Sequence, residues 1–199
     1  MRLYYREGRM AQRLRDEHDE AIAAVCRLPQ RDRGAFWDLV GHPGERLDVG
    51  GIGLGQISPD RTRHLYEPCD ESGPTALIFA ARDLPLRGGG QVLDLVAWLP
   101  RSGEIFCRFG AVDVFGEWHL AVPLVLDEPL VVFADPGSWA RANGAGICIL
   151  DWARARSSLR HVPAFLAPDV DFGRRLREML VPQIPRRPRI LVPRRLCAA

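Results

Sequence analysis

The sequence contains no lysine: its 199 residues include 27 basic side chains, and all of them are arginine. A chain without lysine cannot form a lysine Schiff base with a carbonyl substrate or with pyridoxal phosphate, and it lacks the lysine of a phosphate-binding loop. The absence therefore excludes these classes of chemistry. A GC-rich genome, in which arginine codons are abundant, is the main explanation for it.

Paired cysteines are also missing. The five cysteines lie far apart, their number is odd, and none forms a Cys-x-x-Cys pair, which argues against a disulfide framework and a zinc ribbon. We therefore expect reduced thiols that are mostly buried. The five histidines are equally scattered, so a His/Cys metal site is not expected. The cysteines are Cys26, Cys69, Cys107, Cys148 and Cys197.

Long apolar runs are absent as well. No run approaches the roughly 18 residues that a membrane span needs, and the N-terminus has neither the apolar core nor the cleavage site of a signal peptide. A hydrophobic content of 47% and a charged content of 26% are typical of a soluble globular protein. We expect a cytoplasmic protein with no membrane partner, containing one domain or one domain and a smaller appendage.

Charge is divided unevenly along the chain. Residues 1–127 contain 15 Arg against 19 Asp and Glu, a net charge of −4, whereas residues 128–199 contain 12 Arg against 6 Asp and Glu, a net charge of +6. A basic C-terminal third suits a partner that carries phosphate groups, although ordinary solvated surfaces also produce such asymmetry.

Residues 1–74 are predicted to form an N-terminal helical and loop region. Apolar residues recur every three or four positions across 9–28, and a second short helix is predicted at 35–40. The glycines of 48–60 lack the spacing of a dinucleotide-binding loop, so a glycine-rich strand or bulge is predicted there, followed by a polar loop at 61–75.

Residues 75–127 are predicted to form an antiparallel β segment. The runs TALIFAARD, QVLDLVAWL and EIFCRFG are short, rich in β-branched and aromatic residues, and separated by turns that contain glycine. This pattern indicates an antiparallel meander.

Residues 128–199 change to an alternation of strands and helices. Short apolar runs predict strands at 130–134, 146–151, 162–167 and 189–193, with a helix in each interval. Alternation with short connections is typical of βαβ units. The chain is therefore predicted to be an α/β protein, with N-terminal helices and an antiparallel β segment followed by a Rossmann-like, four-stranded parallel sheet.

Aspartates follow three of these strands. The carboxyl ends of parallel strands lie along one edge of a sheet, so Asp135, Asp151 and the pair Asp169 and Asp171 are expected there. In an extended segment the pair lies on one side, where its oxygens suit Mg²⁺, and Asp135 can join them if the first and third strands are neighbours. The alternative is that Asp169 or Asp171 caps the helix that begins near Phe172.

Two segments resemble the motifs of the Toprim domain, which is found in bacterial and phage primases, topoisomerases and related nucleases. LVVFADPGSWARANGAG is similar to the first motif and FLAPDVDFGRRLREML to the second, while TALIFAARD and the strands after it are similar to the β segment before Toprim in phage-type primases. The resemblance covers about residues 75–193. It implies a Toprim-like sheet, a general acid/base at Asp135, and Mg²⁺ bound at Asp169 and Asp171.

The chain departs from the family pattern at Asp135, where the family has Glu, and at Pro136, which is inserted before the glycine. The shorter side chain displaces the carboxylate, and such a shift can remove much of a reaction rate. We therefore predict a divergent Toprim-like protein of phage or mobile-element type, with a degenerate Mg²⁺-dependent nucleotidyl or phosphoryl transfer site. The alternative is a catalytically inactive protein-interaction or structural module on the same scaffold.

DNA or RNA is the predicted partner. Arg174, Arg175 and Arg177 lie on the polar side of the last predicted helix, where they can contact phosphates. Trp139 and Trp152 are further candidates, since they could stack on bases, although tryptophans beside a sheet more often pack against it.

Overall fold

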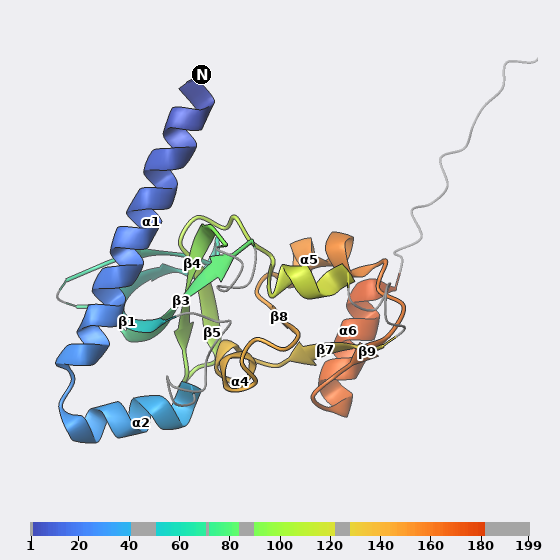
Figure 1. Ribbon diagram of the computed structural model, residues 1–199. Helices are drawn as coiled ribbons and strands as arrows, with labels where there is room; N and C mark the ends of the chain where they lie inside the picture. Colours follow the sequence, from blue (N-terminus) through green and yellow to red (C-terminus); the bar gives the residue numbers. More distant parts are fainter. Residues whose placement is uncertain (1, 41–50, 71, 84–89, 122–127, 182–199) are drawn as a thin grey trace, which may run out of the picture.

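The chain folds into a five-stranded barrel and a separate four-stranded sheet, with helices packed around both (Figure 1). The computed structural model describes residues 2–40, 51–70, 72–83, 90–121 and 128–181. Five α-helices and two mixed sheets within these residues confirm the predicted α/β class. The helices are α1 (Arg2–Arg27), α2 (Gln30–Val40), the 3₁₀ turn η3 (Glu117–Ala121), α4 (Pro136–Arg141), α5 (Trp152–Leu159) and α6 (Val170–Leu180).

The barrel has the strand order β1-β2-β5-β4-β3. Strands β3, β4 and β5 pair antiparallel, as predicted, and β1 pairs antiparallel with both β2 and β3. A parallel bridge from Leu65 in β2 to Cys107 in β5 closes the barrel. The strands are β1 (Ile52–Asp60), β2 (Leu65–Pro68), β3 (Thr75–Arg82), β4 (Val92–Leu99) and β5 (Glu104–Cys107).

Two predictions about the barrel need correction. The segment 61–75 was predicted to be a polar loop, but it contains β2, in which only Tyr66 is buried and the apolar alternation is therefore too weak to recognise. The predicted boundary between 1–74 and 75–127 falls inside the barrel, because β1 is hydrogen-bonded to β3 along five residue pairs.

Strands β3 and β4 are buried on both faces, which explains their nearly continuous apolar sequences. On one face, Ile78 and Leu95 pack with Leu14 of α1. On the other face, Phe79 and Trp98 belong to a cluster that reaches α2, α4 and β8. Each large apolar side chain buried in this way contributes about 1.5–3 kcal/mol.

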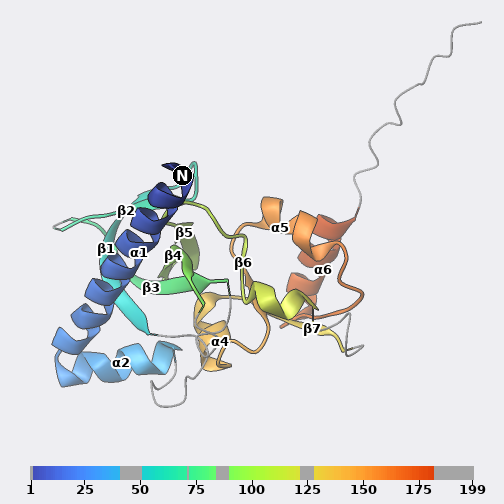
Figure 2. The ribbon, with the colours of Figure 1, turned by 45° about the horizontal axis from the view of Figure 1, so that its top comes forward.

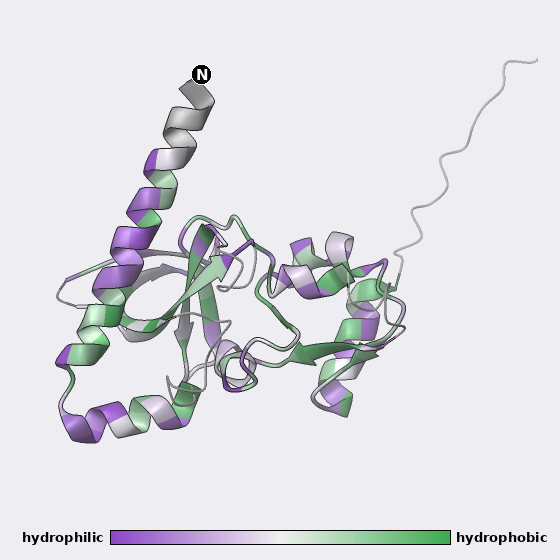
Figure 3. Cartoon of the chain, viewed as in Figure 1, coloured by the Kyte–Doolittle hydropathy of each residue, from purple (hydrophilic) through white to green (hydrophobic). Residues whose placement is uncertain are grey.

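Helix α1 is amphipathic and runs along the barrel, so that its N-terminal end projects beyond the strands (Figure 1). Its apolar residues pack mainly on β1 and β4. In Figure 3, α1 alternates between hydrophilic and hydrophobic residues, whereas β7 (Leu130–Phe133) is coloured hydrophobic along its length. Among the described residues, no helix combines the length and apolarity that crossing a bilayer requires.

The second sheet has the order β6-β8-β7-β9. Strand β7 pairs in parallel with both β8 and β9, but β6 pairs antiparallel with β8, so the prediction of a purely parallel four-stranded sheet is wrong for this strand. Strand β6 has only two residues and no sequence pattern of its own. The predicted strand at 189–193 lies outside the described residues. The strands are β6 (Val114–Phe115), β7 (Leu130–Phe133), β8 (Ile147–Ile149) and β9 (Phe165–Leu166).

Helix α4 packs between the barrel and the second sheet (Figure 2). A Cβ atom at Gly137 would lie 2.6 Å from the ring of Trp98, so only glycine allows α4 to approach β4 this closely. Beside it, Trp139 stacks on Phe115 with ring centroids 4.7 Å apart, and its indole nitrogen donates to the carbonyl of Gly146. These contacts join the two sheets through one apolar core.

Candidate functional site

A cleft of about 310 Å³ lies where the carboxyl ends of β7 and β8 meet the barrel. Besides the ends of β7 and β8, it is lined by the turn between β1 and β2, by strand β5 with the turn before it, and by the N-terminal halves of α5 and α6. This is the edge of the sheet at which open α/β folds bind ligands. The polar and aromatic residues that line it are Arg61, His64, Glu104, Trp152, Phe172 and Arg175.

The barrel side of the cleft is a basic turn with a fixed backbone. The carboxylate of Asp60 accepts the backbone N–H groups of Thr62 and Arg63, and His64 has a left-handed φ of 55°. Arg61 donates through two nitrogens to Glu104, at 2.7 and 3.4 Å. The hydrogen bond from Arg61 lowers the pKa of the Glu104 carboxyl. The turn therefore presents its arginines from a defined position.

The opposite side of the cleft is aromatic and basic. The rings of Trp152 and Phe172 lie 5.1 Å apart, and the guanidinium of Arg175 lies 3.9 Å from the centre of the Trp152 ring. Such a cation–π contact holds a flexible arginine in one place. The planar edge of the guanidinium, which carries N–H donors, remains suited to a phosphate oxygen.

The aspartates that follow the strands act as helix N-caps. Asp135 accepts the backbone N–H and the hydroxyl of Ser138 at the start of α4. Asp151 caps α5, and Asp169 accepts the N–H of Phe172 at 2.7 Å at the start of α6. Strands β7 and β9 are neighbours, as a shared site requires, but each of these carboxylates is directed to its own helix.

Asp171 differs from the prediction in its backbone. Helix α6 begins at Val170, so Asp171 lies in its first turn, and the extended geometry assumed for the D-x-D pair is absent. The Asp171 side chain is 86% exposed and forms an ion pair with Arg174 at 2.8 Å. Within the described residues, no group of three or more His, Cys, Asp or Glu is placed to hold a metal. These aspartates therefore do not fit a multidentate Mg²⁺ site as they stand.

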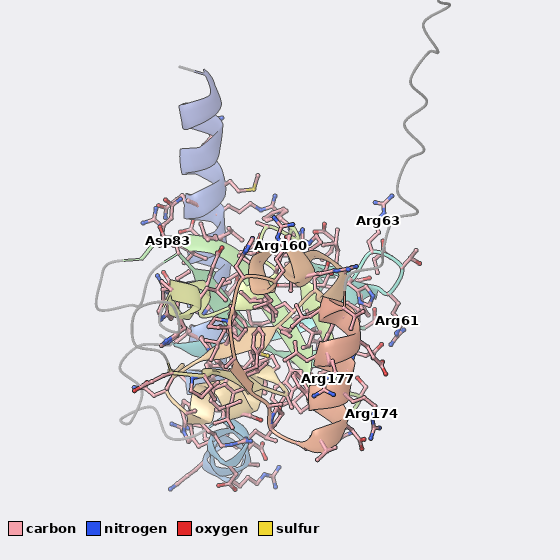
Figure 4. All side chains as sticks on the ribbon, turned by 90° about the vertical axis from the view of Figure 1, so that its right-hand side faces the viewer. Arg61, Arg63, Asp83, Arg160, Arg174 and Arg177 are labelled. Atoms are coloured by element: carbon pink, nitrogen blue, oxygen red, sulfur yellow. The ribbon has the colours of Figure 1, made fainter. Side chains whose placement is uncertain are left out.

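The three arginines of α6 point to two different surfaces. Arg175 lines the cleft, whereas Arg174 and Arg177 line a groove on the β9 side of the helix. Figure 4 shows Arg174 and Arg177 on the same side of the molecule as Arg61 and Arg63, far from Asp83. Of these three arginines, Arg175 is therefore the one that can contact a nucleic acid bound in the cleft.

The two tryptophans that were candidates for base stacking differ in their exposure. Trp139 is 1% exposed within the core and is inaccessible to a base, whereas Trp152 is half-buried at the cleft. The cleft residues of the barrel were not predicted from the sequence. The only signal there was the run of basic residues in DRTRH, residues 60–64, within a segment predicted to be a loop.

Beside the cleft, Arg154 of α5 binds the segment that follows β5 of the barrel. Arg154 forms ion pairs with Asp113 at 2.7 Å and with Asp151 at 3.1 Å, and it donates to the carbonyls of Gly110 and Val112. Burial raises the pKa of the Asp113 carboxyl. These contacts hold the segment after β5 against the N-terminus of α5 and so maintain the position of Trp152.

The chain matches no protein-family model, no curated protein and no solved structure.

Proposed function

We propose that this chain is a nucleic-acid-associated protein of Toprim-like type, which contacts DNA or RNA at the cleft between the barrel and the second sheet. One observation carries the proposal: Arg61, Arg175 and Trp152, from three separate elements, line one cleft at the carboxyl edge of parallel strands. Arginines that contact phosphates supply most of the affinity for nucleic acids, and an aromatic ring supplies stacking on bases.

The arrangement of charge supports the same partner. Arg63 is 77% exposed beside Arg61 on the basic turn, and Arg175 is exposed on the facing helix. A backbone that passes between the turn and α6 would meet guanidinium groups on both sides. Glu104 neutralises part of this charge, but it also fixes the orientation of Arg61.

The Toprim-like assignment rests on the sequence motifs and on the order strand, helix, strand, helix, strand, helix from β7 to α6. Phage or mobile-element origin and a role near DNA replication follow from the same resemblance. The resemblance also implies a degenerate Mg²⁺ site at Asp169 and Asp171, which the helix cap of Asp169 and the Asp171–Arg174 ion pair do not fit. We derive no catalytic step from it, because the described carboxylates cap helices and do not converge.

A catalytically inactive interaction module on the same scaffold is the second candidate. The observation that favours it is that Asp135, Asp151 and Asp169 all have structural roles as N-caps. This candidate predicts a protein partner and no dependence on a metal.

A salt series of binding assays tests the nucleic-acid proposal. Fluorescence anisotropy with labelled single-stranded DNA, duplex DNA and RNA should give a log affinity that falls linearly with log salt, with a slope of about −0.7 per phosphate contact for a single strand. A flat dependence on salt, or no binding to any of the three, would refute the proposal.

Matched variants localise the binding. Arg61→Ala should reduce the magnitude of the salt slope by about one contact and weaken binding to every sequence equally. Arg31→Ala changes an exposed arginine of α2, which does not line the cleft, and should have no effect. Equal effects of the two changes would place the binding outside the cleft.

A further inference from the structure

A second open groove, of about 840 Å³, lies on the other side of α6, between this helix and the β9 segment. Its lining is partly apolar and partly basic, and it shares no lining residue with the cleft. The residues that matter for its chemistry are Phe165, Val170 and Val181, which are apolar, and Arg160, Arg174 and Arg177, which are basic.

Two of the most exposed large apolar side chains, Val170 and Val181, line this groove, and a third, Leu166, lies on the strand beside it. Of the five large apolar side chains that are exposed in the described part of the chain, three lie on β9 or at the ends of α6: Leu166 at 55%, Val170 at 78% and Val181 at 54%. Single exposed apolar residues are ordinary, but a group beside a groove marks a surface that another molecule covers.

Within the described residues, strand β9 has no neighbouring strand on the side away from β7. It pairs with β7 through the bridges Leu130–Phe165 and Val131–Leu166, and it is the last strand in the order of the second sheet within the described residues. Such an edge can accept an extended peptide as an additional strand, with main-chain hydrogen bonds for affinity and alternate side chains for specificity.

Charge decides between the possible occupants. Residues 182–199 of the chain contain five arginines and no acidic residue, so their charge has the same sign as that of Arg160, Arg174 and Arg177. A second copy would bring the same three arginines to the same edge. Asp171, paired with Arg174, offsets part of this basic rim.

We propose that this groove binds an extended segment of a partner protein that presents both apolar and acidic side chains on one face. The backbone of the segment pairs with the edge of β9 that faces away from β7. Because side chains alternate along a strand, every second residue of the segment faces the groove, where its apolar side chains contact Phe165 and Val170 and its acidic side chains reach Arg160 and Arg177. The apolar floor distinguishes this partner from a nucleic acid.

The test uses the full chain and a labelled probe peptide in which Val and Glu take turns at every second position, with Ser between them, so that both types of side chain face the groove. We expect it to bind at least about tenfold more tightly than a matched peptide in which Lys replaces Glu, a difference of about 1.4 kcal/mol. N-methylation of every second peptide nitrogen should weaken binding to a similar extent, because it removes the donors that pair with β9. Equal binding of the Glu and Lys peptides would overturn the proposal.

Two surface variants check the location. Val170→Asp places a negative charge in the groove at a side chain that is already 78% exposed, so the fold should tolerate it while peptide binding falls at least about tenfold. Met10→Asp, at a 47% exposed side chain of α1, is the matched control and should leave binding unchanged. Equal responses to the two changes would show that the peptide binds elsewhere.

Competition experiments with the labelled probe test two other possible occupants of the groove. If a peptide with the sequence of residues 182–199 displaces the Glu–Val probe, the groove belongs to the chain's own C-terminal segment. If single-stranded DNA displaces the probe and Val170→Asp weakens both ligands equally, the groove is part of a nucleic-acid surface. Either result would overturn the proposal of a partner protein.

Discussion

Arg108 Nε donates a hydrogen bond of 3.0 Å to Glu17 Oε2, joining the end of β5 to α1 across 91 positions of the sequence. The Arg108 side chain is only 1% exposed, and it also pairs with Glu67 at 2.7 Å. A buried arginine is tolerated only when its charge is paired, so this contact fixes the place at which α1 crosses the barrel.

Arg108→Met should therefore lower the free energy of unfolding by about 1.5–3 kcal/mol, because Glu17, which keeps its ion pair with Arg13, and Glu67 lose charge-assisted hydrogen bonds from a buried guanidinium. Urea unfolding followed by circular dichroism measures the change. Arg101→Met, at an exposed site, should change stability by less than about 0.5 kcal/mol. A double-mutant cycle with Glu17→Gln should show coupling, and additive effects would mean that the pair contributes nothing.

Asp94→Asn is expected to destabilise the barrel although it changes few atoms. The Asp94 carboxylate is fully buried and accepts backbone N–H groups from Leu95, Phe109 and Ala111, at 2.8, 3.0 and 2.7 Å. Burial raises its pKa, and these hydrogen bonds oppose the shift. An amide would direct its own NH₂ group at one of these donors, at a cost of about 1–3 kcal/mol. Thermal unfolding that is unchanged in the variant would contradict this.

The short elements from 130 to 180 could be predicted from the sequence because each apolar run is local and is bounded by proline, glycine or aspartate. Strand β2 could not, since its closing contact with Cys107 depends on the barrel as a whole. The same holds for the cleft: Arg61 and Glu104 are 43 positions apart and meet only when the barrel forms. Asp169 shows a different limit, because a helix cap and a metal ligand have the same sequence signature.

His18 should make stability fall as pH is lowered. The side chain is 3% exposed, and its Nε2 lies 3.0 Å from the carbonyl oxygen of Gly51. Burial lowers the pKa of His18, and the positive charge of Arg82 lowers it further. The hydrogen bond with Gly51 and the negative charge of Asp19 raise it by less. The folded state therefore binds fewer protons than the unfolded state, whose histidine titrates near about pH 6.5. Stability is fully present above this pH and should fall below it by up to about 1.4 kcal/mol per pH unit.

The measurement is the free energy of unfolding between about pH 7.5 and 5.5, a window chosen because unperturbed carboxyl groups titrate below it. His18→Gln should remove most of the slope while keeping a donor for Gly51. His161→Gln, at an exposed histidine after α5, should keep the slope of the parent chain. A slope that persists in the His18 variant would assign it to another group.

Asp169 tests whether the D-x-D pair caps a helix or binds a metal. Asp169→Ala should lower the free energy of unfolding by about 0.5–2 kcal/mol, and Asp169→Ser should recover most of this loss, because serine also caps helices. Titration with Mg²⁺ or Mn²⁺, followed by the melting temperature, should give the same response in the parent chain and in the double variant Asp169→Asn with Asp171→Asn. A cation-dependent stabilisation that only the parent chain shows would establish the metal site.

Variants of Arg175 and Arg177 can test whether the cleft and the groove are two separate binding sites. The two residues are two positions apart on α6, and both are exposed. Arg175 lies over Trp152 in the cleft, and Arg177 lines the groove beside β9. Arg175→Ala should weaken binding of single-stranded DNA and reduce the magnitude of its salt slope by about one contact, while leaving the acidic peptide unaffected.

Arg177→Ala should give the reverse pattern: weaker peptide binding and an unchanged salt slope with DNA. Both variants remove one positive charge from the same helix, so a general loss of electrostatic attraction would lower both affinities in both proteins. Anisotropy titrations of the two variants with the two ligands therefore distinguish two separate sites from one continuous basic face. If Arg177→Ala weakens DNA binding as much as Arg175→Ala does, the nucleic-acid surface extends around α6, as the arginine-rich sequence of this helix first predicted.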